Sequence, residues 1–197
     1  MRIALIWGAL VLLIGVPIAL AAQSPYLAFR QPIYIMAGFA GIVGLGLLVL
    51  QPLLAARLLP GLTPPRARRL HSFVGMALVA AVAVHVAGLW VFSPPDVLDA
   101  FLLRSPTPFS TWGVIAMWAI FAAACLGFLR RRLGLGPQTW RRSHTALATI
   151  TVLGTVLHAL LIEGTMEPVS KAVLAVLALG ATLKALIDLR VWTRRPR

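Results

Sequence analysis

Two stretches of the chain carry the pattern that decides its fold: RRLHSFVGMALVAAVAVH at residues 68–85 and RRSHTALATITVLGTVLH at residues 141–158. Each begins with two arginines and has a histidine at its fourth and last positions. The pattern R-R-x-H-(13 residues)-H therefore occurs twice, with a constant offset of 73 residues. In both stretches the 13 residues between the histidines include no charged side chain. Few other positions match, so the repeat is concentrated in residue types that can do chemistry.

The composition around these stretches is that of an integral membrane protein. Of the 197 residues, 60% are hydrophobic and only 12% are charged, whereas about a quarter of the residues of a soluble domain are charged. The mean hydropathy of +0.92 agrees with this class. No phosphate-binding glycine motif is present. The single cysteine, Cys125, excludes an internal disulfide and a thiolate cluster, and we expect it to be a small buried hydrophobe.

Six apolar segments are long enough to cross the membrane, which takes about 20 helical residues. Their backbone groups need partners within the membrane, so each segment should be a helix. We therefore predict an all-α fold, a six-helix bundle that forms a single domain over residues 1–197. The predicted spans cover residues 3–22, 33–56, 71–92, 111–129, 144–162 and 171–189. Residues 1–22 also resemble a signal peptide, but their apolar run is longer than usual, which favours an uncleaved first helix.

Positive charge is concentrated on one side of the predicted bundle. That side has 14 of the 18 basic residues: Arg2, Arg57, Arg66, Arg68, Arg69, Arg130, Arg131, Arg132, Arg141, Arg142, Arg190, Arg194, Arg195 and Arg197. The other side has Arg30, Arg104 and Lys171, and four of the five acidic residues: Asp96, Asp99, Glu163 and Glu167. Because basic loops stay in the cytoplasm, we expect both termini there, in a bacterial inner membrane. The net charge of +13 thus reflects topology and lipid contact, and we expect no nucleic acid partner.

The spacing of the four histidines predicts two stacked pairs. Fourteen residues make about 3.9 helical turns, so the two histidines of one helix point to nearly the same face, ~21 Å apart along the axis. The third and fifth spans run in the same direction because one span lies between them. His71 should therefore lie level with His144 near the cytoplasm, and His85 level with His158 towards the outer side.

A neutral imidazole is a good axial ligand for haem iron, and helix-bundle cores are usual places for haem. We expect two b-type haems between the third and fifth spans, held by His71 with His144 and by His85 with His158. Because no C-x-x-C-H motif exists, the haems would be bound non-covalently. Candidates to bind the propionates of the inner haem are Arg68, Arg69, Arg141 and Arg142. The simpler interpretation is that these histidines form hydrogen bonds between helices.

The repeated pattern resembles the ferric reductase-like transmembrane domain. This domain is shared by ferric reductases, NADPH oxidases and the haem-binding membrane subunit of the bacterial methionine-sulfoxide reductase system (the MsrQ or YedZ type). The glycine-rich stretch GFAGIVGLGLLVLQPLLAARL at residues 38–58 is similar to the same family. The resemblance covers about residues 33–190. It implies that the four histidines are the axial ligands of an inner and an outer haem.

Ferric reductases and NADPH oxidases continue into a flavin- and nicotinamide-binding region, which we expect this chain to lack. It would then be a haem-binding oxidoreductase subunit of the stand-alone type, with no catalytic residue of its own. Electrons would come from a cytoplasmic flavin reductase or a quinol, with FMN or a quinone as a further cofactor. The acceptor would be a periplasmic reductase, ferric iron or oxygen.

Two other interpretations fit part of the pattern. The cytochrome b of quinol-oxidising complexes also has two histidines about 14 residues apart on each of two helices. It would be expected to carry a Pro-Glu-Trp-Tyr-like motif, which Glu167-Pro168 is not. Alternatively, a membrane transporter or metal-binding protein without haem would use the histidine pairs to relay protons or to bind a transition metal.

Overall fold

The computed structural model of the chain describes residues 1–130 and 132–192, and the regular secondary structure of this part is all helical. The elements are α1 (Arg2–Ala22), a short 3₁₀ helix (Pro25–Phe29), α2 (Pro32–Ala55), α3 (Pro64–Phe92), α4 (Pro94–Phe101), α5 (Pro108–Leu129), α6 (Pro137–Leu161) and α7 (Pro168–Leu189). All α-helices except α4 are long and apolar enough to cross a membrane. The predicted all-α fold with six spans is confirmed for these residues, and the protein is a multi-pass membrane protein.

The additional helix α4 was not predicted, because Ser93-Pro94-Pro95 suggests a turn. Proline is tolerated in the first turn of a helix, where its missing N–H would have no partner. The hydroxyl of Ser93 donates to Asp96 Oδ2 at 2.6 Å, which supports the start of α4. The helix connects α3 to α5 at one end of the bundle.

Two spans begin seven residues earlier than predicted. Helix α3 begins at Pro64 and α6 at Pro137, whereas the apolar segments suggested residues 71 and 144. Hydropathy marks where a helix enters the hydrocarbon, but both helices begin before that point, with a polar first turn that starts at a proline. The candidate arginines at positions 68, 69, 141 and 142 therefore lie on helices, one turn before the first histidine of each pair.

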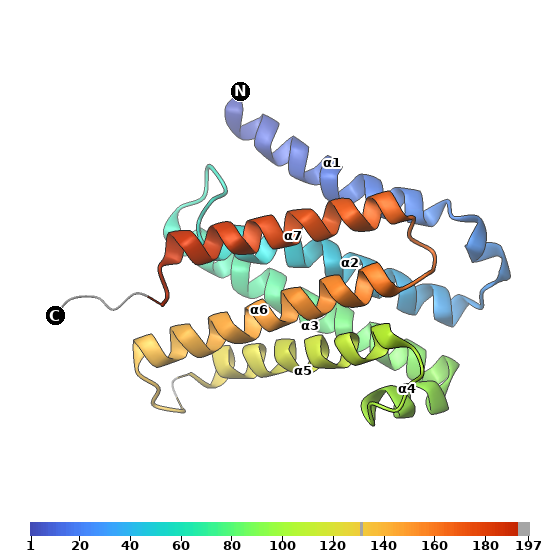
Figure 1. Ribbon diagram of the computed structural model, residues 1–197. Helices are drawn as coiled ribbons and strands as arrows, with labels where there is room; N and C mark the ends of the chain where they lie inside the picture. The colour runs from blue at the N-terminus through green and yellow to red at the C-terminus, as the bar shows by residue number, and fades with distance from the viewer. Residues whose placement is uncertain (131, 193–197) are drawn as a thin grey trace.

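Two helix pairs form the main body of the molecule (Figure 1). Helix α2 packs along α3, and α5 packs along α6, with α7 across α2 and α6. Small residues allow the close contact that membrane helices favour. A Cβ added to Gly88 would lie 2.8 Å from the Cβ of Ala37, and one added to Gly154 would lie 3.0 Å from the Cβ of Ala116. Five helices share one buried cluster, which includes Leu45, Leu48, Val49, Leu78, Ile120, Val152, Val156, Leu174, Ala175 and Ala178.

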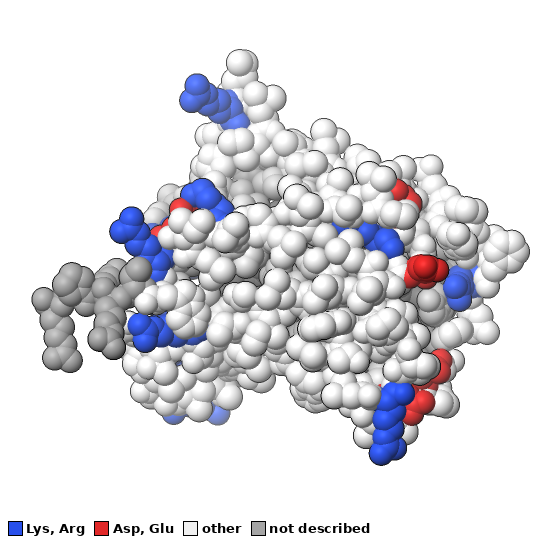
Figure 2. Space-filling view, in the orientation of Figure 1, with Lys and Arg blue, Asp and Glu red and all other residues white. Residues whose placement is uncertain are grey.

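The charged residues gather towards the two ends of the bundle, and basic groups lie at both ends (Figure 2). We call one end the basic end; it includes Arg57, Arg66, Arg68, Arg69, Arg130, Arg132, Arg141, Arg142 and Arg190. We call the other the acidic end, because it has four of the five acidic residues: Asp96, Asp99, Glu163 and Glu167; Arg30, Arg104 and Lys171 also lie there. Lys184 and Asp188 form an ion pair on α7. Cys125 is exposed on α5, so the expectation that it is buried was wrong; on a spanning helix, an exposed side chain faces lipid.

Candidate functional site

The structure brings the four histidines together in the two predicted pairs. The ring centres of His71 and His144 are 6.3 Å apart, and those of His85 and His158 are 6.2 Å apart. The ring planes are nearly perpendicular, at 71° and 81°. One histidine of each pair comes from α3 and the other from α6. The third and fifth spans therefore face each other at both levels.

Each histidine is held by a backbone carbonyl of the helix that packs against its own. The acceptors on α2 are Gln51 O for His71 (3.2 Å) and Ala37 O for His85 (2.7 Å). The acceptors on α5 are Ala123 O for His144 (3.2 Å) and Phe109 O for His158 (2.9 Å). Because a carbonyl can only accept, the ring nitrogen that it contacts, Nδ1, must carry the proton. This leaves Nε2 of all four rings with a free lone pair.

These acceptors extend the repeat that is visible in the sequence. Ala37 and Gln51 are 14 residues apart, as are Phe109 and Ala123, and the second set follows the first with an offset of 72 residues. The α2–α3 pair and the α5–α6 pair are therefore two versions of one unit. The sequence did not reveal these acceptors, because any residue can supply a backbone carbonyl. The signal that could have found them is the same 14-residue spacing, applied to the helix that precedes each histidine-bearing helix.

The distance between the rings fits one metal ion in each pair. Two bonds of about 2.0–2.1 Å from a metal to imidazole nitrogen, plus about 1.1 Å from each nitrogen to its ring centre, separate the ring centres by about 6.3 Å. Among the residues described, no group of three or more His, Cys, Asp or Glu side chains comes together. Each pair therefore offers two ligands. A bare zinc ion needs about four, so the remaining ligands would belong to a bound group.

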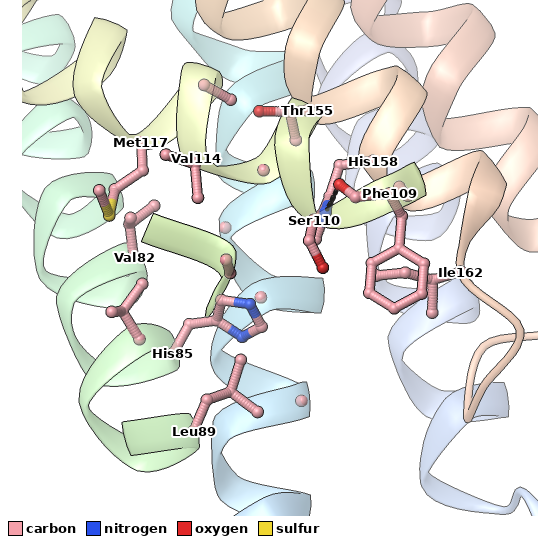
Figure 3. A pocket seen from close by; sticks show the side chains of 18 of the residues that line it. Val82, His85, Leu89, Phe109, Ser110, Val114, Met117, Thr155, His158 and Ile162 are labelled. Carbon is pink, nitrogen blue, oxygen red and sulfur yellow. Dashed lines mark hydrogen bonds between the residues drawn. The ribbon is translucent and has the colours of Figure 1, made fainter. Parts of the chain in front are cut away.

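A cavity of about 530 Å³ adjoins the His85–His158 pair, and it is within the usual size range for a small-molecule or cofactor site. Figure 3 shows both rings among apolar side chains that line this cavity, including Val82, Val114 and Met117. Ser110 and Thr155 add hydroxyl groups. The cavity is thus mostly apolar with a few polar groups, as expected for a flat, largely hydrophobic ligand.

Two glycines give the rings of this pair the room they occupy. A Cβ on Gly41 of α2 would lie 3.0 Å from His85 Nδ1, and one on Gly113 of α5 would lie 2.6 Å from His158 Nδ1. Both glycines follow the acceptor carbonyl by four residues, at Ala37 and Phe109. A side chain at either position would push the ring away from its carbonyl.

The His71–His144 pair has different neighbours. Trp140 stacks on His144 with ring centres 5.3 Å apart and planes at 13°. The guanidinium of Arg130 lies over the Trp140 ring, 4.3 Å from its centre. The side chain of Gln51 donates to the backbone oxygen of His71 at 3.3 Å, so Gln51 both donates to and accepts from this histidine. On α6, the side chain of Trp140 covers His144 of this pair.

The four candidate arginines have different surroundings. Arg68 and Arg69 are exposed at the beginning of α3. Arg141 donates from Nη2 to the carbonyl of Leu189 at 2.8 Å and so ties α6 to the end of α7. Arg142 has a buried Nε atom without a hydrogen-bond partner, as does Trp140 at Nε1. Buried donors without a partner are rare in proteins, so Arg142 is the arginine with the clearest capacity to bind an anion.

A comparison with protein families assigns the chain to a family. The model of the family described as "Ferric reductase like transmembrane component" matches residues 40–161, which is more than half of the chain. The chain belongs to this family. No curated protein and no solved structure matches the chain.

The match to the ferric reductase-like family covers the part of the chain that holds the site. It runs from α2 to the last residue of α6 and includes all four histidines. Helix α1 and helix α7 lie outside the matched residues. The family suggests a role in electron transfer across the membrane, and the two repeated helix pairs are the part of the molecule that would perform it.

Proposed function

We propose that the protein is a transmembrane b-type cytochrome that passes single electrons through two haems with paired histidine ligands. The observation that carries this proposal is the geometry of the four imidazoles. Each donates its Nδ1–H to a backbone carbonyl, and each pair has ring centres 6.2–6.3 Å apart. A hydrogen bond to the other ring nitrogen is the usual way in which proteins orient a metal-bound histidine and raise its basicity.

The residues present fit haem better than a bare metal ion. Haem brings four nitrogen ligands of its own and needs two from the protein, which is the number that each pair supplies. When bound, it supplies reversible one-electron chemistry between ferric and ferrous iron. His71 and His144 would hold one haem and His85 and His158 the other, both non-covalently. Because each histidine pair would supply two ligands to its haem, the sites would favour electron transfer over binding of small ligands.

The two ends of the bundle support a direction for the electrons. We place the basic end in the cytoplasm because basic loops are retained there. A basic surface attracts an acidic donor and raises the rate of encounter. The donor would be a cytoplasmic flavin reductase or a quinol, with FMN or a quinone as intermediary. The acceptor at the acidic end would be a periplasmic reductase or ferric iron. In this role the chain is the haem-binding membrane subunit of an oxidoreductase in a bacterial inner membrane, similar to the MsrQ or YedZ type.

Spectra of the purified protein test this proposal. We expect a Soret band and an α band that sharpen and shift on reduction with dithionite, and a pyridine haemochrome assay should give two b haems per chain. Elemental analysis on the same sample measures iron and other transition metals. Protein with a bound metal but no porphyrin would contradict the proposal and favour the metal-binding or transporter alternative, as would protein that binds neither.

A further inference from the structure

A buried lysine lies at the acidic end of the bundle, beside the cavity. Lys171, near the start of α7, is only 9% exposed. The same cavity is lined by Lys171, His85 and His158. A charged side chain within a membrane protein is costly unless it is paired, and it usually marks a functional site. This lysine was assigned no role from the sequence.

The protein itself satisfies only part of the lysine ammonium group. Its Nζ atom donates to the backbone oxygen of Ile162. An ammonium has three N–H donors. Within the part of the chain that the structure describes, no carboxylate lies at ion-pair distance from Lys171, whereas Lys184 on the same helix is paired with Asp188. The buried ammonium therefore has donors to spare and no carboxylate in direct contact with it.

The nearest acidic groups have other roles or lie at the surface. Glu167 caps α7, and its carboxylate accepts from the hydroxyl and the N–H of Ser170 and from the N–H of Val169. These bonds, first of all the one from the Ser170 hydroxyl, hold the pKa of Glu167 below its usual value, with a smaller contribution from the charge of Lys171. Glu163 lines the cavity but is exposed.

The position of the ammonium relates it to the His85–His158 pair. It contacts the backbone oxygen of Ile162, the residue that follows the last residue of α6 and lies four positions after His158. The ammonium therefore lies beyond His158 at the acidic end of α6, and Lys171 lines the same cavity as both histidines. A ligand held between the two rings would present its polar edge at this end of the cavity.

We propose that Lys171 binds a carboxylate of the ligand held between His85 and His158. Resting on the proposed function, this inference makes Lys171 the positioning residue for a propionate of the haem at the acidic end. One buried cation at this site would thus have the role that we expect of the candidate arginines at the basic end. The carboxylate would neutralise the charge of the lysine, and the lysine would fix the orientation of the porphyrin between the two histidines.

The test uses protein that carries one haem. In a His144→Ala background the His85–His158 site is the one that remains complete, so the rate of haem transfer to an excess of apomyoglobin reports on this site. We expect Lys171→Gln to raise that rate about tenfold, because a charge-assisted hydrogen bond is lost. Lys171→Arg should retain the wild-type rate. Lys184→Gln, which removes a lysine from the exposed ion pair of the same helix, is the matched control and should change nothing.

A second arm identifies the carboxylate. Apoprotein is reconstituted with the dimethyl ester of haem, in which both propionates are blocked. We expect the ester to leave the Lys171 protein as fast as it leaves the Lys171→Gln protein, since the lysine then has no anion to hold. If Lys171→Gln does not fold, the faster release of the ester than of haem from protein with Lys171 intact carries the test.

A second measurement separates a charge near the haem from a purely structural role. Removal of a positive charge should favour ferric haem, so the midpoint potential of Lys171→Gln should fall by up to about 59 mV, a tenfold shift of the one-electron equilibrium. Equal release rates of haem from wild-type and Lys171→Gln protein, or equal acceleration by Lys184→Gln, would overturn the inference. Wild-type protein without any haem would instead overturn the proposed function.

Discussion

The two histidine pairs have the same geometry but different surroundings. Their ring centres differ in separation by only 0.1 Å, at 6.3 Å and 6.2 Å, and all four Nδ1 atoms contact backbone carbonyls. The His85–His158 pair lines an apolar cavity, whereas His144 of the other pair is covered by Trp140. The shared part comes from the positions that repeat in the two helix pairs, and the different part comes from side chains at positions that do not repeat, such as Trp140.

This difference separates the residues that would bind a cofactor, which repeat, from the residues that would adapt each site to its redox partner, which do not. Each helix pair supplies a histidine and an oriented carbonyl at each of two levels, and the two helix pairs together form the two histidine pairs. The stack of Arg130, Trp140 and His144 occurs at the basic end, where the proposed donor arrives. The cavity and the buried Lys171 occur towards the acidic end, where electrons would leave.

Single substitutions that remove one histidine, in one pair or in the other, should have the largest effect and test the two sites separately. We expect His85→Ala and His144→Ala each to bind one haem where the wild type binds two, because an axial position cannot be filled by alanine. The pyridine haemochrome assay measures the loss. Potentiometric titration shows which component disappears, and it should be a different one in each variant.

A cross-pairing would give another result. If His71 shared a haem with a residue other than His144, the double variant His71→Ala/His144→Ala would lose both haems. Loss of one haem in this double variant, with the potential of the remaining haem unchanged from that in His144→Ala, is the outcome that agrees with the structure.

The glycines beside the cavity provide a second and smaller test, which affects one site. In Gly113→Ala the new Cβ would lie 2.6 Å from His158 Nδ1, so the ring must move away from the carbonyl of Phe109. We expect partial loss of the haem at the His85–His158 site and an unchanged haem at the other. Gly41→Ala, with a contact of 3.0 Å to His85 Nδ1, should cause a smaller loss.

Gly180 on α7 is the matched control for this test. A Cβ at this position meets no atom within 4 Å, so Gly180→Ala should leave both haems in place. Since alanine favours a helix over glycine by up to about 1 kcal/mol, the control should unfold at a slightly higher temperature. Equal haem loss in Gly113→Ala and Gly180→Ala would show that the contact with the ring does not matter.

The spans could be predicted from the sequence because hydropathy and helix length are properties of contiguous residues. The pairing of His71 with His144 followed from two simple facts, the 14-residue spacing and the single span between the helices. Helix α4 and the early starts of α3 and α6 could not be predicted in this way. They depend on proline in a first turn, which the same residues would also allow in a loop.

The surroundings of the site were less predictable than its histidines. The carbonyl acceptors became visible only when α2 was seen against α3 and α5 against α6, because any residue can supply a carbonyl. Arg141 and Arg142 are neighbours in the sequence, yet one contacts α7 and the other has a buried N–H without a partner. Such differences depend on which way a helix faces, and the acceptor of Arg141, Leu189, lies 48 residues later in the chain.

The tryptophan at the basic end provides the smallest test and affects the other site alone. Trp140→Leu removes the ring that covers His144 but no ligand, so both haems should remain bound. Water would then reach the His71–His144 site, and because water favours the charged ferric form, the potential of this haem should fall by up to about 59 mV. Trp140→Phe keeps an aromatic stack, worth about 0.5–1.5 kcal/mol, and should lie between Trp140→Leu and wild type. The potential of the haem at His85 and His158 should be the same in all three proteins. A shift of both potentials would mean that the two sites are coupled through the bundle, and that the tryptophan does not distinguish them.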